Sequence, residues 1–251
     1  MKWQTSCGML LAVALGSVLD SAIAETITIN PTADVFYDKR DFTHTESPSV
    51  TLYGEPGANY LDLASEDQPY AERILMKFDT SGLAGATIKS ATLRLFSRKG
   101  PPGDALDVYR VTSDWADKDS NWVNRIHSTT TAWTHPGGDF ANSLGEAQTL
   151  AKPFATRNYA NVAKSGTDAA PRGVANDWNI TTLVQGWASG TFPNFGLMII
   201  KPLTEKNGQA FFVSSEFADF PNLKPQLIVE ADIKPGPATA ASAPSTQPAN
   251  P

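Results

Sequence analysis

Short segments in which apolar and polar residues alternate recur along this chain and constrain its fold more than any other feature. They are separated by Gly-, Pro-, Asn- and Asp-rich turns and fall at residues 26–29, 71–78, 87–96, 106–111, 195–200, 211–213 and 226–230. Alternation with a period of two is typical of strands with one buried face, and the nearly all-apolar segment 195–200 (FGLMII) predicts a buried central strand. Many short strands joined by turns predict an all-β sandwich or barrel.

One helical segment interrupts the strands. The sequence from Thr181 to Trp187 (TTLVQGW) predicts a helix of about two turns, with threonines to cap its start and Gly186 or Gly190 to end it. Residues 129–174 are rich in Thr, Ala, Gly, Asn and Pro and predict long loops with one or two short strands. Loops of that length are often functional.

The two ends of the chain differ in composition from the region between them. Residues 1–24 combine Lys2, an apolar run over residues 9–19 and the small residues of Ala22-Ile23-Ala24, which predicts a signal peptide cleaved before Glu25 and a secreted or periplasmic protein. The alternative is an uncleaved membrane anchor, but the apolar run is too short for one. No later segment is long enough to span a bilayer. Residues 234–251 are rich in Pro, Ala, Ser and Thr and predict a disordered tail, so residues 25–233 form the predicted domain.

Cysteine content and net charge exclude two classes of protein. The one cysteine, Cys7, lies inside the predicted signal peptide, so the exported chain cannot be a small disulfide-stapled scaffold. The net charge is −6, with lysines and arginines scattered along the chain. This acidic balance argues against a nucleic-acid partner.

The histidines do not indicate a catalytic or metal site. His44, His127 and His135 have no metal-ligand spacing, and the chain contains no Gly-x-Ser-x-Gly turn that would present a nucleophile. We therefore interpret the three histidines as loop surface residues and expect no catalytic residue among them.

A cluster of acids and aromatics follows the strand at residues 106–111. It contains three aspartates and two tryptophans: Asp114, Trp115, Asp117, Asp119 and Trp122. Two carboxylates held close together could serve a glycosidase. We favour another interpretation, in which the aspartates cap backbone groups of a solvated turn and the tryptophans anchor the core.

The alternation also places four basic residues on strand faces. Arg73 and Lys77 share one face of their strand, and Arg94 and Arg98 share one face of the next. If the two strands belong to one sheet, these cations gather on a single face. Because the planar fork of arginine fits a carboxylate or sulfate, such a face predicts binding of an acidic polymer. Ordinary surface charge is the alternative.

An ordered series of blocks resembles the DNRLRE family. The blocks are RILMKFD at 73–79, SGL at 81–83, SATLRL at 90–95, VYRVT at 108–112 with Trp115 and Asn121-Trp122, LVQGW at 183–187, NFGL at 194–197, Ser215-Glu216 and PQL at 225–227. The resemblance covers nearly all of residues 31–231 and implies an antiparallel jelly roll similar to carbohydrate-binding modules attached to polysaccharide-degrading enzymes such as alginate lyases, and to disaggregatase-related proteins. Asn179 and Lys224 depart from the Asp and Arg that are usual in the family.

The resemblance also bears on cofactors. Jelly-roll modules often hold a structural calcium ion between early and late strands. Asp34, Asp79 and Asp232 are available for such a site, although their spacing is not that of a known calcium loop. No cofactor is expected to be required.

Together, the residues and the resemblance predict a non-catalytic protein that binds an acidic polysaccharide such as alginate. The alternatives are a polysaccharide-degrading lyase or hydrolase and a structural protein of the envelope or biofilm matrix. A neutral polymer would instead be held by stacking, for which Trp115 and Trp133 are the candidates. The sequence leaves the glycan and the oligomeric state open.

Overall fold

The computed structural model describes residues 23–39, 60–66, 71–99, 102–161, 173–202 and 209–233. Its strands form two six-stranded sheets and a small two-stranded one, and every pair of named strands is antiparallel. The predicted all-β sandwich with one short helix is therefore confirmed. The predicted tail and residues 1–22 lie outside the described residues, and the first strand begins at Ile23, two residues before the expected cleavage point.

Sheet A is ordered along its hydrogen-bonded neighbours as β1 (Ile23–Ile29), β14 (Gln226–Ile233), β5 (Thr87–Lys99), β13 (Ala210–Val213) and β3 (Tyr60–Leu63). A sixth strand, β11 (Val174–Asn179), pairs with the other edge of β5. The 13-residue β5 is long enough to pair with three strands, β11, β13 and β14, and it is the central strand of the sheet.

Sheet B is ordered as β10 (Ala155–Asn158), β6 (Ala105–Val111), β12 (Leu197–Ile200), β4 (Glu72–Phe78) and β2 (Pro31–Asp38), with β9 (Phe140–Ala141) also paired to β6. The apolar β12 lies between β6 and β4, as its composition predicted. Successive strands β4, β5 and β6 alternate between the sheets, as do β11, β12 and β13, in the manner of a jelly roll.

The main core lies between the two sheets. Ile74 and Met76 of β4 pack in one cluster with Leu93 and Leu95 of β5, as the alternation predicted. Each such side chain, once buried, stabilises the fold by about 1.5–3 kcal/mol relative to exposure. Trp178 of β11 contributes the largest fully buried side chain of this cluster and donates its indole N–H to the carbonyl of Leu106, 3.0 Å away.

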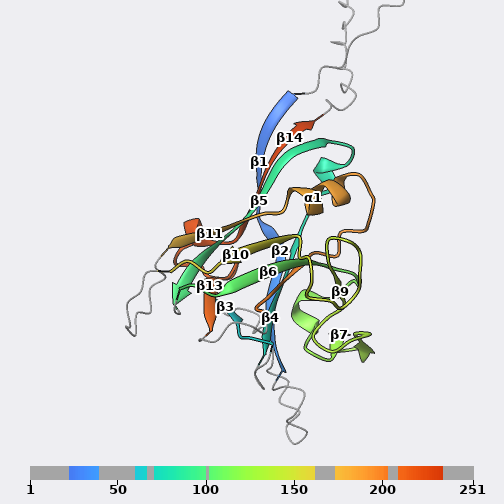
Figure 1. Ribbon diagram of the computed structural model, residues 1–251, viewed down its shortest axis with the longest axis vertical. Coiled ribbons are helices and arrows are strands. Elements are labelled where there is room, and N and C mark those ends of the chain that lie inside the picture. The colour runs from blue at the N-terminus through green and yellow to red at the C-terminus, as the bar shows by residue number, and fades with distance from the viewer. Residues whose placement is uncertain are drawn as a thin grey trace, which may run out of the picture.

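A second core lies on the other side of sheet B. Residues 112–150, which we call the cover, fold over the outer face of this sheet. In Figure 1 they are the yellow-green segment with β7 (Asn124–Ile126) and β9 that lies to one side of β6 and β4. The cover also contains β8 (Thr131–Ala132) and the 3-10 turn η3 (Asp117–Asp119). Its three tryptophans and Phe140 pack on Leu75, Tyr109 and Met198 of the sheet. Sheet B is thus buried on both faces.

The helix α1 (Thr181–Ala188) forms as predicted and lies beside β5, and it ends just before Gly190 as expected, but no threonine caps its start. Ile180 occupies the N-cap position without a side-chain cap, and Thr181 Oγ1 instead accepts a hydrogen bond from the Ala91 amide at 2.9 Å. Gly186 lies within the helix, and Gly190 follows it with a φ of +70°. Two 3-10 turns, η2 (Ser81–Leu83) and η4 (Pro221–Leu223), complete the described elements, and no described helix is long and apolar enough to cross a membrane.

Candidate functional site

The four predicted basic residues do not share one face. Arg73 and Lys77 lie on β4 in sheet B, whereas Arg94 and Arg98 lie on β5 in sheet A. The inner faces of both strands are occupied by the main core, so the two pairs point away from opposite sides of the sandwich. The expectation of a single cationic face is wrong, because strands consecutive in the chain belong to different sheets.

Arg73 is buried beneath the cover. Its Nε and Nη2 each donate to one carboxylate oxygen of Glu66 at 2.7 Å, and its Nη1 donates to the Gly137 carbonyl at 3.0 Å. The guanidinium also lies 5.1 Å from the ring centre of Trp122 and 5.4 Å from that of Phe140. With every nitrogen engaged, Arg73 links sheet B to its cover and is not offered to a ligand.

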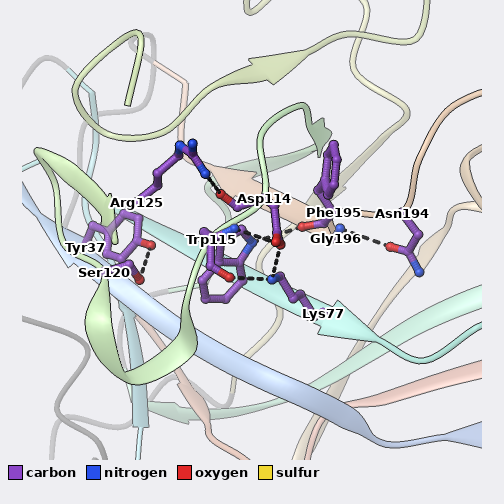
Figure 2. Close-up of polar contacts among 9 residues, drawn as sticks. All are labelled: Tyr37, Lys77, Asp114, Trp115, Ser120, Arg125, Asn194, Phe195 and Gly196. Atoms are coloured by element: carbon purple, nitrogen blue, oxygen red, sulfur yellow. Dashed lines mark hydrogen bonds and ion pairs between the residues drawn. The ribbon is translucent and has the colours of Figure 1, made fainter. Parts of the chain in front are cut away.

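Lys77 lies at the margin of the cover (Figure 2). Its Nζ donates to Asp114 Oδ1 at 2.7 Å and to the Trp115 carbonyl, and it lies 4.8 Å from the Trp115 ring centre. The hydrogen bond from Lys77 is the largest cause that lowers the pKa of Asp114. Arg125 holds the same corner by donating to the Asp114 carbonyl at 3.0 Å. Lys77 therefore serves the attachment of the cover.

The tryptophans of the cover are core anchors, as the sequence indicated for Trp115 and Trp122. Trp115, Trp122 and Trp133 are all buried in the second core. The indole N–H of Trp115 donates to the Phe195 carbonyl at 2.9 Å (Figure 2), and that of Trp133 to the Asn121 carbonyl at 2.9 Å. Because Trp115 and Trp133 are 3% and 4% exposed, the alternative of a stacking platform for a neutral sugar does not fit them.

The aspartates of the same cluster accept hydrogen bonds within the cover. Asp119 accepts from the Ser128 amide at 2.9 Å, and Asp114 accepts from the Trp115 amide at 2.9 Å, as turn-capping carboxylates do. Asp117 differs, since burial and the nearby charge of Glu216 raise its pKa. The three carboxylates therefore have separate structural surroundings.

Arg94 lies on the outer face of sheet A, where it pairs with Asp177 of β11 in a bidentate manner. Arg94 Nε donates to Oδ1 at 2.8 Å and Nη2 donates to Oδ2 at 2.6 Å. Both side chains are 35% exposed. The hydrogen bond from Arg94 is the largest cause that lowers the pKa of Asp177. Arg98 is half-buried and extends the row four residues further, roughly 13 Å along β5.

A third arginine, which the sequence did not point to, acts on the same carboxylate through its charge. Arg157 projects from β10, the edge strand of sheet B, and its charge also lowers the pKa of Asp177. Its Nη2 donates to the Ala175 carbonyl at a long 3.4 Å, and its buried Nε has no hydrogen-bond partner among the described residues. Arg157 lies in the region predicted as long loops with one or two short strands, and the contact of β10 with β11 brings it near Asp177.

The three aspartates named for calcium do not come together. Asp34 accepts from the amide of Ser215 at 2.8 Å and from its hydroxyl, Asp79 accepts from the Ser81 amide at 2.9 Å, and Asp232 pairs with Lys89. No group of three or more His, Cys, Asp or Glu side chains within the described ranges could hold a metal ion. Calcium binding by the protein stays an untested prediction.

Of these three aspartates, Asp34 has the pKa that is shifted furthest from its ordinary value. It is 6% exposed on the edge strand β2, and burial together with the charge of Glu216 raises its pKa to about 7. Asp117 of the cover also faces Glu216, so two acids in different parts of the fold are affected by the same carboxylate. Asp34 joins β2 to the connection between β13 and β14 through Ser215.

The histidines take part in loop contacts. His127 Nδ1 lies 3.1 Å from Asn121 Nδ2, and His135 Nδ1 lies 3.2 Å from Asp139 Oδ1. His44 lies outside the described residues.

A pocket of about 420 Å³ opens between α1 and the first half of β5. Its lining comprises Ala86, Thr87, Ile88, Thr182, Gln185, Gly186, Ser189, Thr191 and Phe192. None of these residues is charged.

Comparison with known proteins places the chain in a family. The family model of the disaggregatase related repeat domain matches residues 41–229. The chain belongs to this family. A search of the curated proteins finds no match. The disaggregatase relationship indicates a polysaccharide-associated domain.

In this disaggregatase related repeat domain, the matched residues do not include the first two strands. β1 and β2 both lie before residue 41, where the match begins. β1 nevertheless pairs with β14 along its whole length, and β2 pairs with β4. Both strands therefore extend the two sheets by one strand each beyond the matched region and form an outer edge of each sheet.

One of the departures from the family pattern has a structural role. Asn179 Oδ1 accepts from the Thr181 amide at 3.1 Å and from its hydroxyl at 2.7 Å, which stabilises the start of α1. Lys224 is half-buried after η4, and nothing in the structure explains its replacement of arginine.

Proposed function

We propose that this chain is an exported, non-catalytic domain that binds an acidic polysaccharide at the edge where β10 meets β11. One observation carries the proposal: Arg94 from sheet A and Arg157 from sheet B both act on the carboxylate of Asp177. Two guanidinium groups beside one carboxylate leave a positive charge, for which a carboxylate or sulfate of the polymer is a suitable partner.

Unused donors of Arg94 and Arg157 support the proposal. Arg94 engages Asp177 through Nε and Nη2, which leaves Nη1 for a further acceptor. Arg157 makes one long hydrogen bond through Nη2, and its Nη1 makes none among the described residues. Arg98 lies on the same face of β5 and would lengthen the contact along a polymer chain.

Affinity electrophoresis in gels containing alginate, pectate or a neutral glucan tests this site. Arg157→Ala is expected to weaken retardation by the acidic polymers roughly threefold to tenfold, since it removes charged donors. Asp177→Asn is expected to strengthen retardation, because it removes the competing carboxylate. Lys118→Ala is the matched control, since it removes one exposed positive charge from the cover.

Two outcomes contradict the proposed site. In the first, the wild type is retarded by the neutral glucan alone. In the second, Lys118→Ala weakens retardation as much as Arg157→Ala, which would make net charge and not the site responsible.

The non-catalytic part of the proposal has its own test, because a lyase or hydrolase is the alternative. Purified protein incubated with alginate is expected to release neither new reducing ends nor unsaturated sugars above a heat-inactivated control. Export is tested by mass spectrometry of secreted material, which is expected to begin at Glu25.

A further inference from the structure

The pocket beside α1 has a fixed frame. Gln185 Nε2 donates to the Ile88 carbonyl at 3.1 Å, and the Gly85 amide donates to the Ala188 carbonyl at 2.9 Å, so the second half of the helix is tied to the start of β5 and to the residues just before it. The Thr191 amide donates to the Gly186 carbonyl at 3.0 Å and fixes the segment after the helix. A pocket held in this way need not be ordered when a ligand binds.

Phe192 supplies the aromatic part of the lining and is held from several directions. The Arg110 guanidinium lies 4.8 Å from its ring centre, and the Phe154 ring meets it edge-on at 6.3 Å. The tip of the ring rests on Gly186, where a Cβ would come within 2.1 Å of Phe192 Cζ. The absence of a side chain at Gly186 therefore allows Phe192 to lie over the helix and to line the pocket.

The rest of the lining is polar and uncharged. Thr87 and Thr182 are exposed, and their hydroxyls have no hydrogen-bond partner among the described residues. The hydroxyls of Ser189 and Thr191 lie 2.8 Å apart, and each retains capacity for a further hydrogen bond. Gln185 uses its Nε2 on β5 and has its Oε1 left to accept. These groups are both donors and acceptors, as the hydroxyls of a sugar require.

We propose that this pocket binds an uncharged sugar unit, as a second ligand site apart from the proposed polysaccharide site at Arg94, Arg98 and Arg157, which we call the arginine edge. Its volume of about 420 Å³ falls within the range of roughly 300–1,000 Å³ that small-molecule sites occupy. The apolar face of a sugar ring packs on Phe192, and its hydroxyls bond to the threonines and to Gln185. A charged sugar fits less well, because the lining contains no basic side chain to replace the water around a carboxylate.

Nuclear magnetic resonance titration of the whole domain with cellohexaose and laminarihexaose, and in parallel with an alginate hexasaccharide, tests the proposal. At millimolar concentrations at least one neutral hexasaccharide is expected to shift the amide signals of Thr182, Gln185 and Thr191, and the alginate hexasaccharide is not. The double variant Thr182→Ala/Gln185→Ala is expected to weaken neutral binding about tenfold, since two hydrogen bonds are lost. Thr28→Ala, an exposed threonine on β1, is the matched control and is expected to bind like the wild type.

A second variant guards against a trivial loss of fold. Thr182→Lys keeps a helix-compatible residue at an exposed position and fills the pocket entrance, so it is expected to abolish the shifts while the melting temperature stays unchanged. The proposal is overturned if neither neutral hexasaccharide shifts the lining, if the double variant binds equally well, or if the alginate hexasaccharide shifts the lining as strongly. The arginine edge fails independently, because Arg157→Ala leaves this pocket intact and the double variant leaves retardation by alginate unchanged.

Discussion

The outer faces of the two sheets each carry two basic residues four positions apart on one strand, Arg73 and Lys77 on β4 and Arg94 and Arg98 on β5. On sheet B the cover closes over the pair, so Arg73 is 9% exposed and bonded through every nitrogen. On sheet A the side chain of Arg94 remains 35% exposed. An identical alternation pattern therefore yields a buried structural contact on one sheet and a candidate ligand contact on the other, depending on what lies over the face.

The largest expected effect comes from breaking the buried pair. Arg73→Ala leaves Glu66 without its partner and is expected to lower the free energy of unfolding by about 3–5 kcal/mol. Arg94→Ala, the matched control on sheet A, is expected to cost only about 0.2–1 kcal/mol, since its pair is exposed to solvent. Urea unfolding of both variants measures the difference, and equal losses would show that the cover does not seal Arg73 from water.

An intermediate effect on the free energy of unfolding is expected from Asp34, which lies where the cover of sheet B approaches the β13–β14 connection of sheet A. The pKa of Asp34 is raised to about 7, so between the unfolded value of 3.8 and about 7 the folded state holds a proton that the unfolded state releases. The contribution of Asp34 to stability therefore falls as pH rises through this window and stays low above it. Lowering the pH from about 7 to about 5 restores much of it.

Asp34→Asn removes this titration and retains groups that can bond to Ser215. The variant is expected to be more stable than the wild type by about 1–3 kcal/mol near pH 8, with the difference vanishing near pH 4. Glu216 and Asp117 are the other acids of this region, so Asp117→Asn serves as the control for their shared repulsion. Urea unfolding at several pH values decides between the outcomes. If the free energy of unfolding of Asp34→Asn follows the same pH dependence as that of the wild type, the pKa of Asp34 is not raised.

The strands of the main core were predictable because their signal is local. The segments of β4, β5, β6, β12 and β14 alternate or are continuously apolar, and each forms close to the predicted bounds. β2 and β11 were not predicted: β2 (PTADVFYD) carries buried residues on both faces, and β11 (VANDWN) is mostly polar. Their pairing with β4 and β5 decides their conformation, and pairing is a property of distant segments.

The site was less predictable than the fold, for the same reason. Alternation shows that Arg73 and Lys77 share a face, but it cannot show that residues 112–150 return to cover that face. Their burial could be suspected only from Trp115, Trp122 and Trp133, large apolar residues in the covering segment that need a surface to pack on. The approach of Arg157 to Asp177 depends on two strand edges meeting, and no sequence pattern marks it.

The smallest expected effect is a difference between the two sheets in how salt changes the coupling energies of their ion pairs. Double-mutant cycles of Arg94 with Asp177 are expected to give a coupling of about 0.2–1 kcal/mol at low ionic strength, because both side chains contact solvent. Near 1 M salt the Debye length falls to about 3 Å, so this coupling should largely disappear. The cycle of Arg73 with Glu66 should change little, since side chains that are 10% and 12% exposed are poorly screened. An Arg94–Asp177 coupling that resists salt would mean that the outer face of sheet A is also covered. The arginine edge would then not be accessible to a polymer.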